Sequence, residues 1–452
     1  MTENKIQMSF EIDNQTRKDL DIFGTYEGGK SIFDLFNHCN YKGGKDKLYE
    51  FLANPLADIN EIREREEAII FFQNHLPDGL NLDRDALDFS EYYFRHRGYT
   101  SARRPSKIGS IERKLINKIS TGDEYYLIAK GVSSTIDVLK ALYTFSLELS
   151  KKTEIPALIK RYNDDVIKLF EVPELEKVPS LKKITAYDVE SYDYLFRYSQ
   201  NRRLQFIFSM IYEYDVFQSV AKAAQMYNFN YPKILPKSDN CLDIEGIFHP
   251  FVENAISNDV RFDKESNLLF VTGPNMAGKS TFLKALGVAV YLAHTGFPVP
   301  AKNMNISALS GMCTTINISD NLSSGYSHFY AEVMRVKNVA ERLKTTNNML
   351  VIFDELFRGT NVKDAYDGTL AVVSAFTQIH SSFFVISTHI VEAAKELEKY
   401  NNIRFRYFEI QEKDGHPAYT YKLEDGISED RLGMYIIRKE RLIELINEIK
   451  SE

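Results

Sequence analysis

The residues with the clearest chemical potential form a glycine-rich stretch that follows a short apolar run. Residues 273–280 read Gly-Pro-Asn-Met-Ala-Gly-Lys-Ser, with an expected strand before them at 267–271 and an expected helix after them from 282. In that context the spacing is typical of a loop that binds phosphate through its backbone N–H groups. The N-terminus of the following helix also favours anionic charge. The sequence therefore predicts a nucleotide site that consists of Gly273, Pro274, Asn275, Met276, Ala277, Gly278, Lys279, Ser280 and Thr281.

Two side chains of this loop and two later carboxylates have the types that phosphoryl transfer needs. We expect Lys279 to contact the β- and γ-phosphates and the Ser280 hydroxyl to ligate Mg²⁺. The apolar run 349–353 ends at Asp354 and Glu355. Asp354 is predicted to hold Mg²⁺, mostly through water, and Glu355 to orient or deprotonate the attacking water.

A third apolar run, at 383–387, leads to His389. A single histidine is usually structural, but one that follows a strand beside a nucleotide can hydrogen-bond the γ-phosphate or the attacking water. The predicted catalytic residues are therefore Glu355, His389 and Lys279.

The composition excludes several broad classes of protein. The chain has 452 residues, 44% of them hydrophobic and 26% charged, which suits a globular protein of two or three domains. It contains no apolar run of about 18 residues and no signal-like start, and its three cysteines fit neither a disulfide framework nor a zinc site. We expect a cytoplasmic protein without membrane contact. The net charge of −7 restricts nucleic-acid binding to a local patch or a dimer channel.

The two halves of the chain differ in their hydrophobic pattern. Between about residues 30 and 230, apolar residues recur at three- and four-residue spacing, which predicts an all-α domain. From about 240, short apolar runs alternate with helical stretches, as in an α/β sheet. Residues 228–240 read as a linker, residues 402–422 as a hairpin and residues 434–449 as a closing helix.

The order of these motifs, and the residues within them, carry a family resemblance. His249-Pro250 and Asn258-Asp259 precede the phosphate loop, residues 354–361 read Asp-Glu-Leu-Phe-Arg-Gly-Thr-Asn, and Ser-Thr-His ends at 389. With these features the chain resembles the MutS family, the DNA-repair ATPases of the ABC-like P-loop class. The resemblance covers about residues 25 to 440. It implies ATP and Mg²⁺ as cofactors, and an ABC-like α/β P-loop ATPase with a mixed sheet flanked by helices, preceded by an all-α core or lever domain.

The segment 319–332 resembles the family's signature loop, which crosses a dimer interface. By that match Ser327 would contact the γ-phosphate held by the other subunit, while Phe329 and Glu332 would anchor the loop. A serine hydroxyl at a helix start can donate to a phosphate oxygen. From its residues alone, 323–327 reads as a surface turn. The resemblance thus implies a homodimer with composite ATP sites.

Several features depart from the family pattern. From the 24 residues that precede residue 25 we expect neither the mismatch-reading nor the connector domain, and from the short lever region we expect a reduced or missing DNA clamp. The aromatic residue that often precedes the Asn-Asp element is replaced by Ala255 and Ile256, so Phe248 or Phe251 would have to stack on adenine. His328 stands at the signature's usual threonine position, and residues 362–365 form an insertion.

One basic stretch is the best local candidate for contact with nucleic acid. Between residues 95 and 118 there are eight Lys or Arg residues and a single acid, and tyrosines stand nearby. Basic side chains can neutralise phosphates, and tyrosines can stack on unpaired bases. The alternative is a solvated loop between two helices. The residues predicted to contact DNA are Arg95, Arg97, Arg103, Arg104 and Lys107.

The sequence therefore predicts an N-terminal extension (1–24), a helical core or lever domain (25–235) and an ABC-type ATPase domain (236–452). The preferred function is ATP-driven movement of the levers on DNA, sensing DNA structure rather than mismatches. The alternatives are an ATPase module that acts on a protein partner, and a nucleotide-binding scaffold with negligible turnover.

Overall fold

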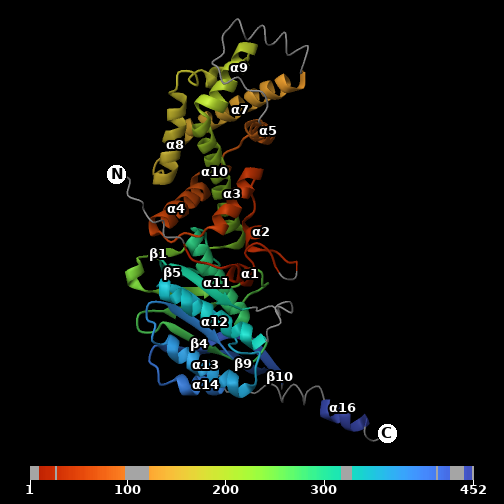
Figure 1. Cartoon of the computed structure of the whole chain (residues 1–452), viewed down its shortest axis with the longest axis vertical. Coiled ribbons are helices and arrows are strands. Elements are labelled where there is room, and N and C mark those ends of the chain that lie inside the picture. The colour runs from red at the N-terminus through yellow and green to blue at the C-terminus, as the bar shows by residue number, and fades with distance from the viewer. Residues whose placement is uncertain are drawn as a thin grey trace. The chain divides into compact units, whose positions relative to one another are not determined.

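The computed structural model describes residues 10–25, 28–96, 122–316, 328–413, 416–427 and 442–449 (Figure 1). These residues belong to two compact units. One unit contains the described residues up to Leu35, Asn54–Arg63 and the chain from Tyr227 onward, and the other contains Phe36–Ala53 and Glu64–Met226. None of the described helices combines the length and the apolar character that a membrane span requires.

The second unit is helical, as its hydrophobic pattern predicts. The helix Asn201–Tyr227 packs aromatic side chains against the helix Ile59–His75: Phe72 lies 5.2 Å from Tyr214 and 5.8 Å from Phe217, measured between ring centroids. The helices from the first half of the chain are α1 (Asn14–Asp19), α2 (Ile32–Phe36), α3 (Lys42–Ala53), α4 (Ile59–His75), α5 (Arg84–Arg95), α7 (Gly122–Leu149), α8 (Ala157–Phe170), η1 (Val178–Ser180), α9 (Ala186–Tyr194), the π-turn η2 (Leu195–Ser199) and α10 (Asn201–Tyr227).

A buried carboxylate fixes the start of α3 in this unit. Both oxygens of Asp215, on α10, accept backbone N–H groups, from Asn40 at 2.9 Å and from Tyr41 at 3.0 Å. Gly44 is required here, because a β-carbon at this position would lie 2.0 Å from the Asp215 carboxylate. These contacts satisfy N–H groups that have no partner within the helix itself.

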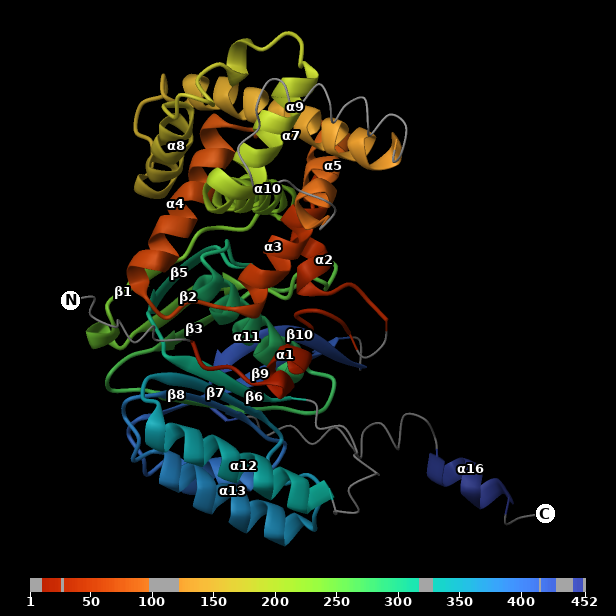
Figure 2. The ribbon, with the colours of Figure 1, turned by 45° about the horizontal axis from the view of Figure 1, so that its top comes forward.

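The first unit contains two sheets, and Figure 2 shows its helices α12 and α13 side by side. In the larger sheet the strand order is β10-β9-β4-β8-β7-β6, with every neighbouring pair parallel except β10 and β9. The smaller sheet has the order β1-β5-β2-β3. The strands are β1 (Lys233–Leu235), β2 (Leu242–Ile247), β3 (Asn258–Phe262), β4 (Leu268–Thr272), β5 (Asn303–Ser307), β6 (Gly311–Thr315), β7 (Met349–Asp354), β8 (Phe383–Ser387), β9 (Ile403–Lys413) and β10 (His416–Asp425).

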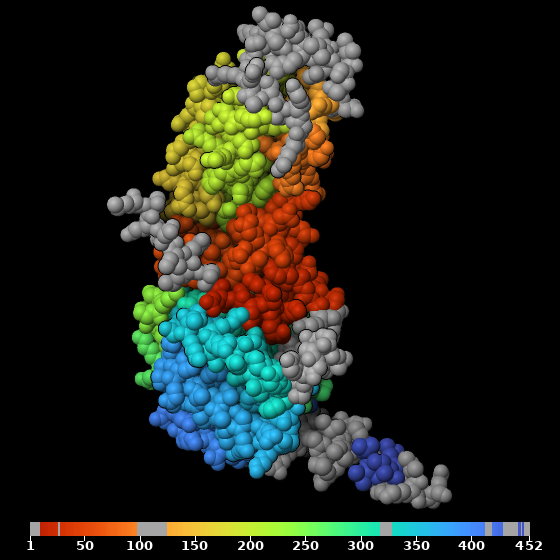
Figure 3. Space-filling view, in the orientation of Figure 1, coloured from red at the N-terminus to blue at the C-terminus, as the bar shows by residue number. Residues whose placement is uncertain are grey.

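Helices surround the larger sheet of this unit. Its central strands are fully buried, and they pack against apolar side chains of α12, α13 and α14, such as Val339, Val373 and Leu397. The outer sides of these helices form the cyan and blue surface in Figure 3. The helical elements described after residue 236 are η3 (Lys237–Asp239), α11 (Lys279–Thr295), α12 (His328–Thr345), α13 (Val362–Phe376), α14 (Val391–Leu397) and α16 (Leu442–Ile449).

The N-terminal residues join the edge of the larger sheet, which the sequence did not predict. Glu11 pairs with Gly311 as a parallel bridge, and the buried carboxylate of Asp19 accepts from Thr314 Oγ1 at 2.7 Å and from the Ile316 N–H at 2.9 Å. The N-terminal segment therefore groups with the chain from Tyr227 onward in one compact unit, since its partners lie about 300 residues away in the chain.

The strands predicted at 268–271, 349–353 and 383–387 are confirmed as β4, β7 and β8, and the predicted hairpin as β9 and β10. The reading of residues 228–240 as a linker is wrong in part. β1 lies within that stretch and pairs with β5, and its residue Ile234 is only 2% exposed. A three-residue strand is too short to show a periodic pattern. Of the predicted closing helix, only residues 442–449 are described, and they are helical.

Candidate nucleotide site

The glycine-rich loop joins β4 to α11 in a backbone conformation that its glycines permit. Gly273 has φ +142° and Gly278 has φ +104°, which are backbone angles that residues with a β-carbon rarely adopt. Lys279 is only 5% exposed, and its ammonium group donates to the carbonyls of Gly273 at 2.8 Å and Pro274 at 3.0 Å. Burial lowers the pKa of Lys279, and the carboxylates of Glu355 and Asp354 oppose that shift. The loop thus presents a buried cation at the start of a helix.

Asp354 ends β7 directly beside this loop. The hydroxyls of Ser280 and Ser387 each donate to one of its two carboxylate oxygens. Burial raises the pKa of Asp354, while these two hydrogen bonds lower it. A serine hydroxyl next to a carboxylate is an all-oxygen donor set of the kind that Mg²⁺ prefers when water and phosphate complete its shell. The residues present therefore fit the predicted Mg²⁺ site.

Glu355 and His389 lie on the same side of the site as Lys279. One carboxylate oxygen of Glu355 is 3.9 Å from Lys279 Nζ and 3.8 Å from His389 Nδ1, and the other is 3.9 Å from Arg358 Nη1. The neighbouring His389 side chain is the largest influence on the pKa of Glu355, and together with the cations of Lys279 and Arg358 it keeps that pKa below its usual value despite burial. Glu355 is therefore ionised at neutral pH.

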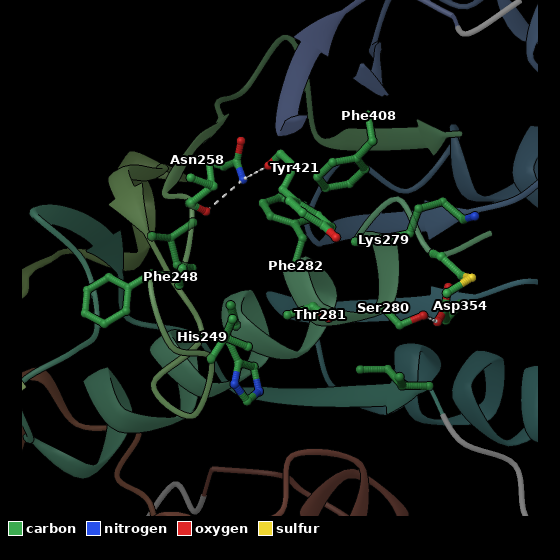
Figure 4. A pocket seen from close by; sticks show the side chains of 18 of the residues that line it. Phe248, His249, Asn258, Lys279, Ser280, Thr281, Phe282, Asp354, Phe408 and Tyr421 are labelled. Atoms are coloured by element: carbon green, nitrogen blue, oxygen red, sulfur yellow. Dashed lines mark hydrogen bonds between the residues drawn. The ribbon is translucent and has the colours of Figure 1, made fainter. Parts of the chain in front are cut away.

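A cavity of about 760 Å³ extends from these residues (Figure 4). Figure 4 shows Lys279, Ser280 and Asp354 at one end of it, and Phe248, His249 and Asn258 at the other. The residues that line it are those of the phosphate loop from Asn275 to Phe282 except Ala277, together with Ile247, Phe248, His249, Val252, Glu253, Asn254, Ala255, Ile256, Asn258, Ala285, Ile316, Asp354, Glu355, Arg358, His389, Phe408 and Tyr421. The cavity thus has a charged end and an end with aromatic side chains.

Of the two aromatic residues predicted to lie near adenine, Phe248 lines this cavity, whereas Phe251 lines a separate hollow. Tyr421, which had no predicted role in the site, is 45% exposed and its ring lies close to Gly278. Tyr421 has φ +55° at an irregularity between Tyr419 and Leu423. The signals in the sequence were the run of aromatic residues in the predicted hairpin and the resemblance of residues 421–423 to the family's C-terminal pattern.

Asn258 holds the backbone at Tyr421 in place. Its side-chain amide donates to the Tyr421 carbonyl at 3.0 Å, and its side-chain oxygen accepts the Leu423 N–H at 2.8 Å. Asn258 is 7% exposed, so both backbone groups would lack a partner without it. These two hydrogen bonds give a structural reason for the asparagine of the Asn-Asp element, which is part of the family resemblance.

The structure brings together the phosphate loop, Asp354, Glu355 and His389, but it describes little of the remaining predictions. Ser327 lies outside the described residues, as do Arg97, Arg103, Arg104 and Lys107. Arg95 ends α5 with its side chain 71% exposed and lies 3.8 Å from Glu91.

The two residues predicted to anchor the signature loop are described and make contacts. Phe329 packs edge-to-face on Phe357 at 5.7 Å, and the Glu332 carboxylate accepts the Gly359 N–H at 3.4 Å. The start of α12 is thereby joined to the loop that follows Glu355.

Comparison with known proteins agrees with this geometry. The family model described as "MutS domain V" matches residues 269–450. The chain is 28% identical to the DNA mismatch repair protein MutS of Petrotoga mobilis, an alignment that covers 94% of this chain. It is 26% identical to the DNA mismatch repair protein MSH3 of Vanderwaltozyma polyspora, over 93% of this chain.

Over residues 269–450 the chain belongs to the family described as MutS domain V, and the two alignments extend the similarity over 94% and 93% of the chain. The region matched to MutS domain V contains the phosphate loop, Asp354, Glu355, His389 and Tyr421, so the charged end of the cavity lies entirely within it. The chain spans 62% and 52% of the lengths of these two MutS relatives.

Proposed function

We propose that this chain hydrolyses ATP to ADP and phosphate at the cavity beside α11, as an ABC-like ATPase. The observation that carries the proposal is the position of the Glu355 carboxylate, which lies within 4 Å of both Lys279 and His389. A carboxylate in that position can take a proton from water as the water attacks the γ-phosphate.

The residues around Glu355 divide the work of phosphoryl transfer. The N–H groups of the phosphate loop bind the β-phosphate, and Lys279 exchanges its bonds to the Gly273 and Pro274 carbonyls for phosphate oxygens. His389 holds the attacking water or the γ-phosphate. Ser280 and Asp354 would hold Mg²⁺, which supplies a charge that offsets the negative charge of the phosphates. The protein contributes chiefly by positioning and by electrostatic stabilisation.

The end of the cavity away from Lys279 and Asp354 suits the adenine base of ATP. Tyr421 lies over the phosphate loop with almost half of its ring exposed, and Phe248 lies at the far end. Burial, reinforced by nearby Lys284, lowers the pKa of His249 to about 4, so this side chain is neutral. We assign adenine to this end, stacked on Tyr421 or Phe248.

We further propose that two copies of the chain combine to complete each site. The resemblance of Ser327 to the signature serine supports this, and so does the anchoring of α12 beside Glu355 through Phe329 and Glu332. Exposed apolar side chains offer further contact surface: Met276 at the tip of the phosphate loop is 81% exposed and Val362 is 77% exposed.

We propose DNA as the macromolecular partner of the helical unit. Both relatives are named as DNA mismatch repair proteins. The preferred function is therefore a MutS-type ATPase whose nucleotide cycle moves the helical unit on DNA. Action on a protein partner is the alternative outcome.

Release of phosphate from ATP tests the enzymatic part. We expect turnover that requires Mg²⁺, stops with EDTA and is abolished by Lys279→Ala, while Lys264→Ala, an exposed lysine between β3 and β4, leaves it unchanged. Turnover that survives Lys279→Ala would contradict the assignment of this cavity as the ATPase site.

A further inference from the structure

A hollow on the helical unit combines unpaired cations with an exposed aromatic ring. It lies between α8 and α10, has a volume of about 390 Å³ and includes the side chains of Lys168, Arg202, Arg203 and Phe206 among its lining. Leu169 and Ile207, which are 1% and 2% exposed, form an apolar floor. We call this feature the basic hollow.

The three cations of the basic hollow are not neutralised by neighbouring carboxylates. None of them has an ion pair within 4.0 Å among the described residues, and neither does Asp165, the one carboxylate in the lining. Other arginines nearby are paired, as in Arg161 with Glu64 at 3.1 Å. The hollow therefore has a local excess of two positive charges.

Phe206 is held in place with nearly half of its surface in solvent. Its side chain is 45% exposed, and Tyr162 packs on it edge-to-face at 5.9 Å. The Tyr162 hydroxyl in turn donates to the Glu213 carboxylate at 2.6 Å, which fixes the orientation of Tyr162. An ordered aromatic ring beside unpaired cations is the arrangement that binds a base and its phosphates together.

We propose that the basic hollow binds single-stranded or unpaired nucleic acid, with phosphates at Lys168, Arg202 and Arg203 and a base stacked on Phe206. Asp165 would accept a hydrogen bond from an exocyclic amino group, which favours cytosine over thymine. A paired base cannot stack on Phe206, so duplex DNA should bind more weakly. This inference deepens the DNA-binding part of the proposed function by naming its surface, and it does not depend on ATP hydrolysis.

Fluorescence anisotropy tests the inference on the full chain, with labelled 20-mers of oligo-dC and oligo-dT and a duplex, each at a low and a moderate salt concentration. The double variant Arg202→Ala/Arg203→Ala should weaken oligo-dC binding about 10-fold or more at low salt. It should also reduce the slope of the logarithm of the binding constant against the logarithm of the salt concentration by about 1.4, since each lost phosphate contact on a single strand contributes about 0.7. Phe206→Leu, which keeps an apolar side chain against Tyr162, should weaken single-strand binding about 5-fold or more and leave duplex binding unchanged.

The matched control is Lys151→Ala/Lys152→Ala, which removes two exposed lysines outside the basic hollow. We expect this control to bind within about 2-fold of wild type, and all variants to keep the wild-type melting temperature and phosphate release. If wild type binds DNA and the Arg202/Arg203 variant behaves like the control, the basic hollow is not the surface, although DNA binding stands. Binding of the wild type to none of the three probes at low salt would overturn both this inference and the DNA part of the proposed function.

Discussion

Replacing Glu355 with glutamine removes the proposed base while keeping its size. The wild-type carboxylate is ionised at neutral pH, because its contacts with His389, Lys279 and Arg358 hold its pKa below the usual value. Glutamine cannot take a proton from water. General-base catalysis contributes about 10²- to 10⁴-fold, which corresponds to about 3 to 5 kcal/mol of the barrier. We therefore expect kcat for phosphate release to fall by that factor in Glu355→Gln.

Binding of ATP should survive the same change. The Glu355 carboxylate lies 3.9 Å from Lys279 Nζ, so in wild type it repels the triphosphate that Lys279 attracts. Glutamine removes this repulsion and leaves the phosphate loop intact. A fluorescent ATP analogue should consequently bind Glu355→Gln as tightly as wild type or more tightly, in the same Mg²⁺ buffer that is used for phosphate release.

The control for this experiment is Glu398→Gln, at an exposed glutamate that follows α14. We expect wild-type turnover from it. Phosphate release by Glu355→Gln within about threefold of wild type, far less than the loss of a general base, would refute the assignment of Glu355 as the base. Loss of nucleotide binding together with turnover would also count against it, since Glu355 would then be needed for the structure of the site.

Three further predictions concern the residues that support the site. Ser387→Ala removes a hydrogen bond that lowers the pKa of Asp354, so the Mg²⁺ concentration for half-maximal phosphate release should rise about 10-fold or more; an unchanged Mg²⁺ titration would contradict this. Asn258→Ala leaves the Tyr421 carbonyl and the Leu423 N–H without partners, at a cost of about 1–3 kcal/mol each, so the melting temperature should fall by several degrees and KM for ATP should rise. Burial holds the pKa of His294 at about 4, below its ordinary 6.5, so the unfolded chain binds the proton first. The free energy of unfolding therefore falls by about 3 kcal/mol as the pH is lowered from 6.5 toward 4. Chemical denaturation of wild type and His294→Gln across this pH range should show a smaller decrease in the free energy of unfolding for the variant.

The charged end of the site could be predicted from the sequence because each of its motifs lies within one short stretch of the chain. The phosphate loop needs its glycines at fixed spacing. Asp354 directly follows an apolar run long enough to read as a buried strand, and His389 stands two residues after the end of another. Since β4, β7 and β8 are parallel, their carboxyl ends meet at one edge of the sheet. The sequence therefore indicated both which residues form the charged end of the site and that these residues lie close together.

The base end and the N-terminal segment could not be predicted in this way. Tyr421 reaches the cavity because Asn258, 163 residues earlier, fixes the backbone at an irregularity of β10. Asp19 is buried against Thr314 and Ile316, and nothing near residue 19 in the sequence indicates these partners. Both cases depend on pairings between distant segments, which local periodicity does not encode.

The most direct test of the central claim is DNA binding by Glu355→Gln with and without Mg·ATP. Fluorescence anisotropy with duplex, mismatched, single-stranded and four-way-branched probes at two salt concentrations is sufficient. We predict that Mg·ATP changes the affinity for at least one probe, because the variant retains ATP and holds the chain in its nucleotide-bound state. Intact wild-type turnover combined with no binding to any probe at low salt would contradict the account and assign the helical unit to a protein partner.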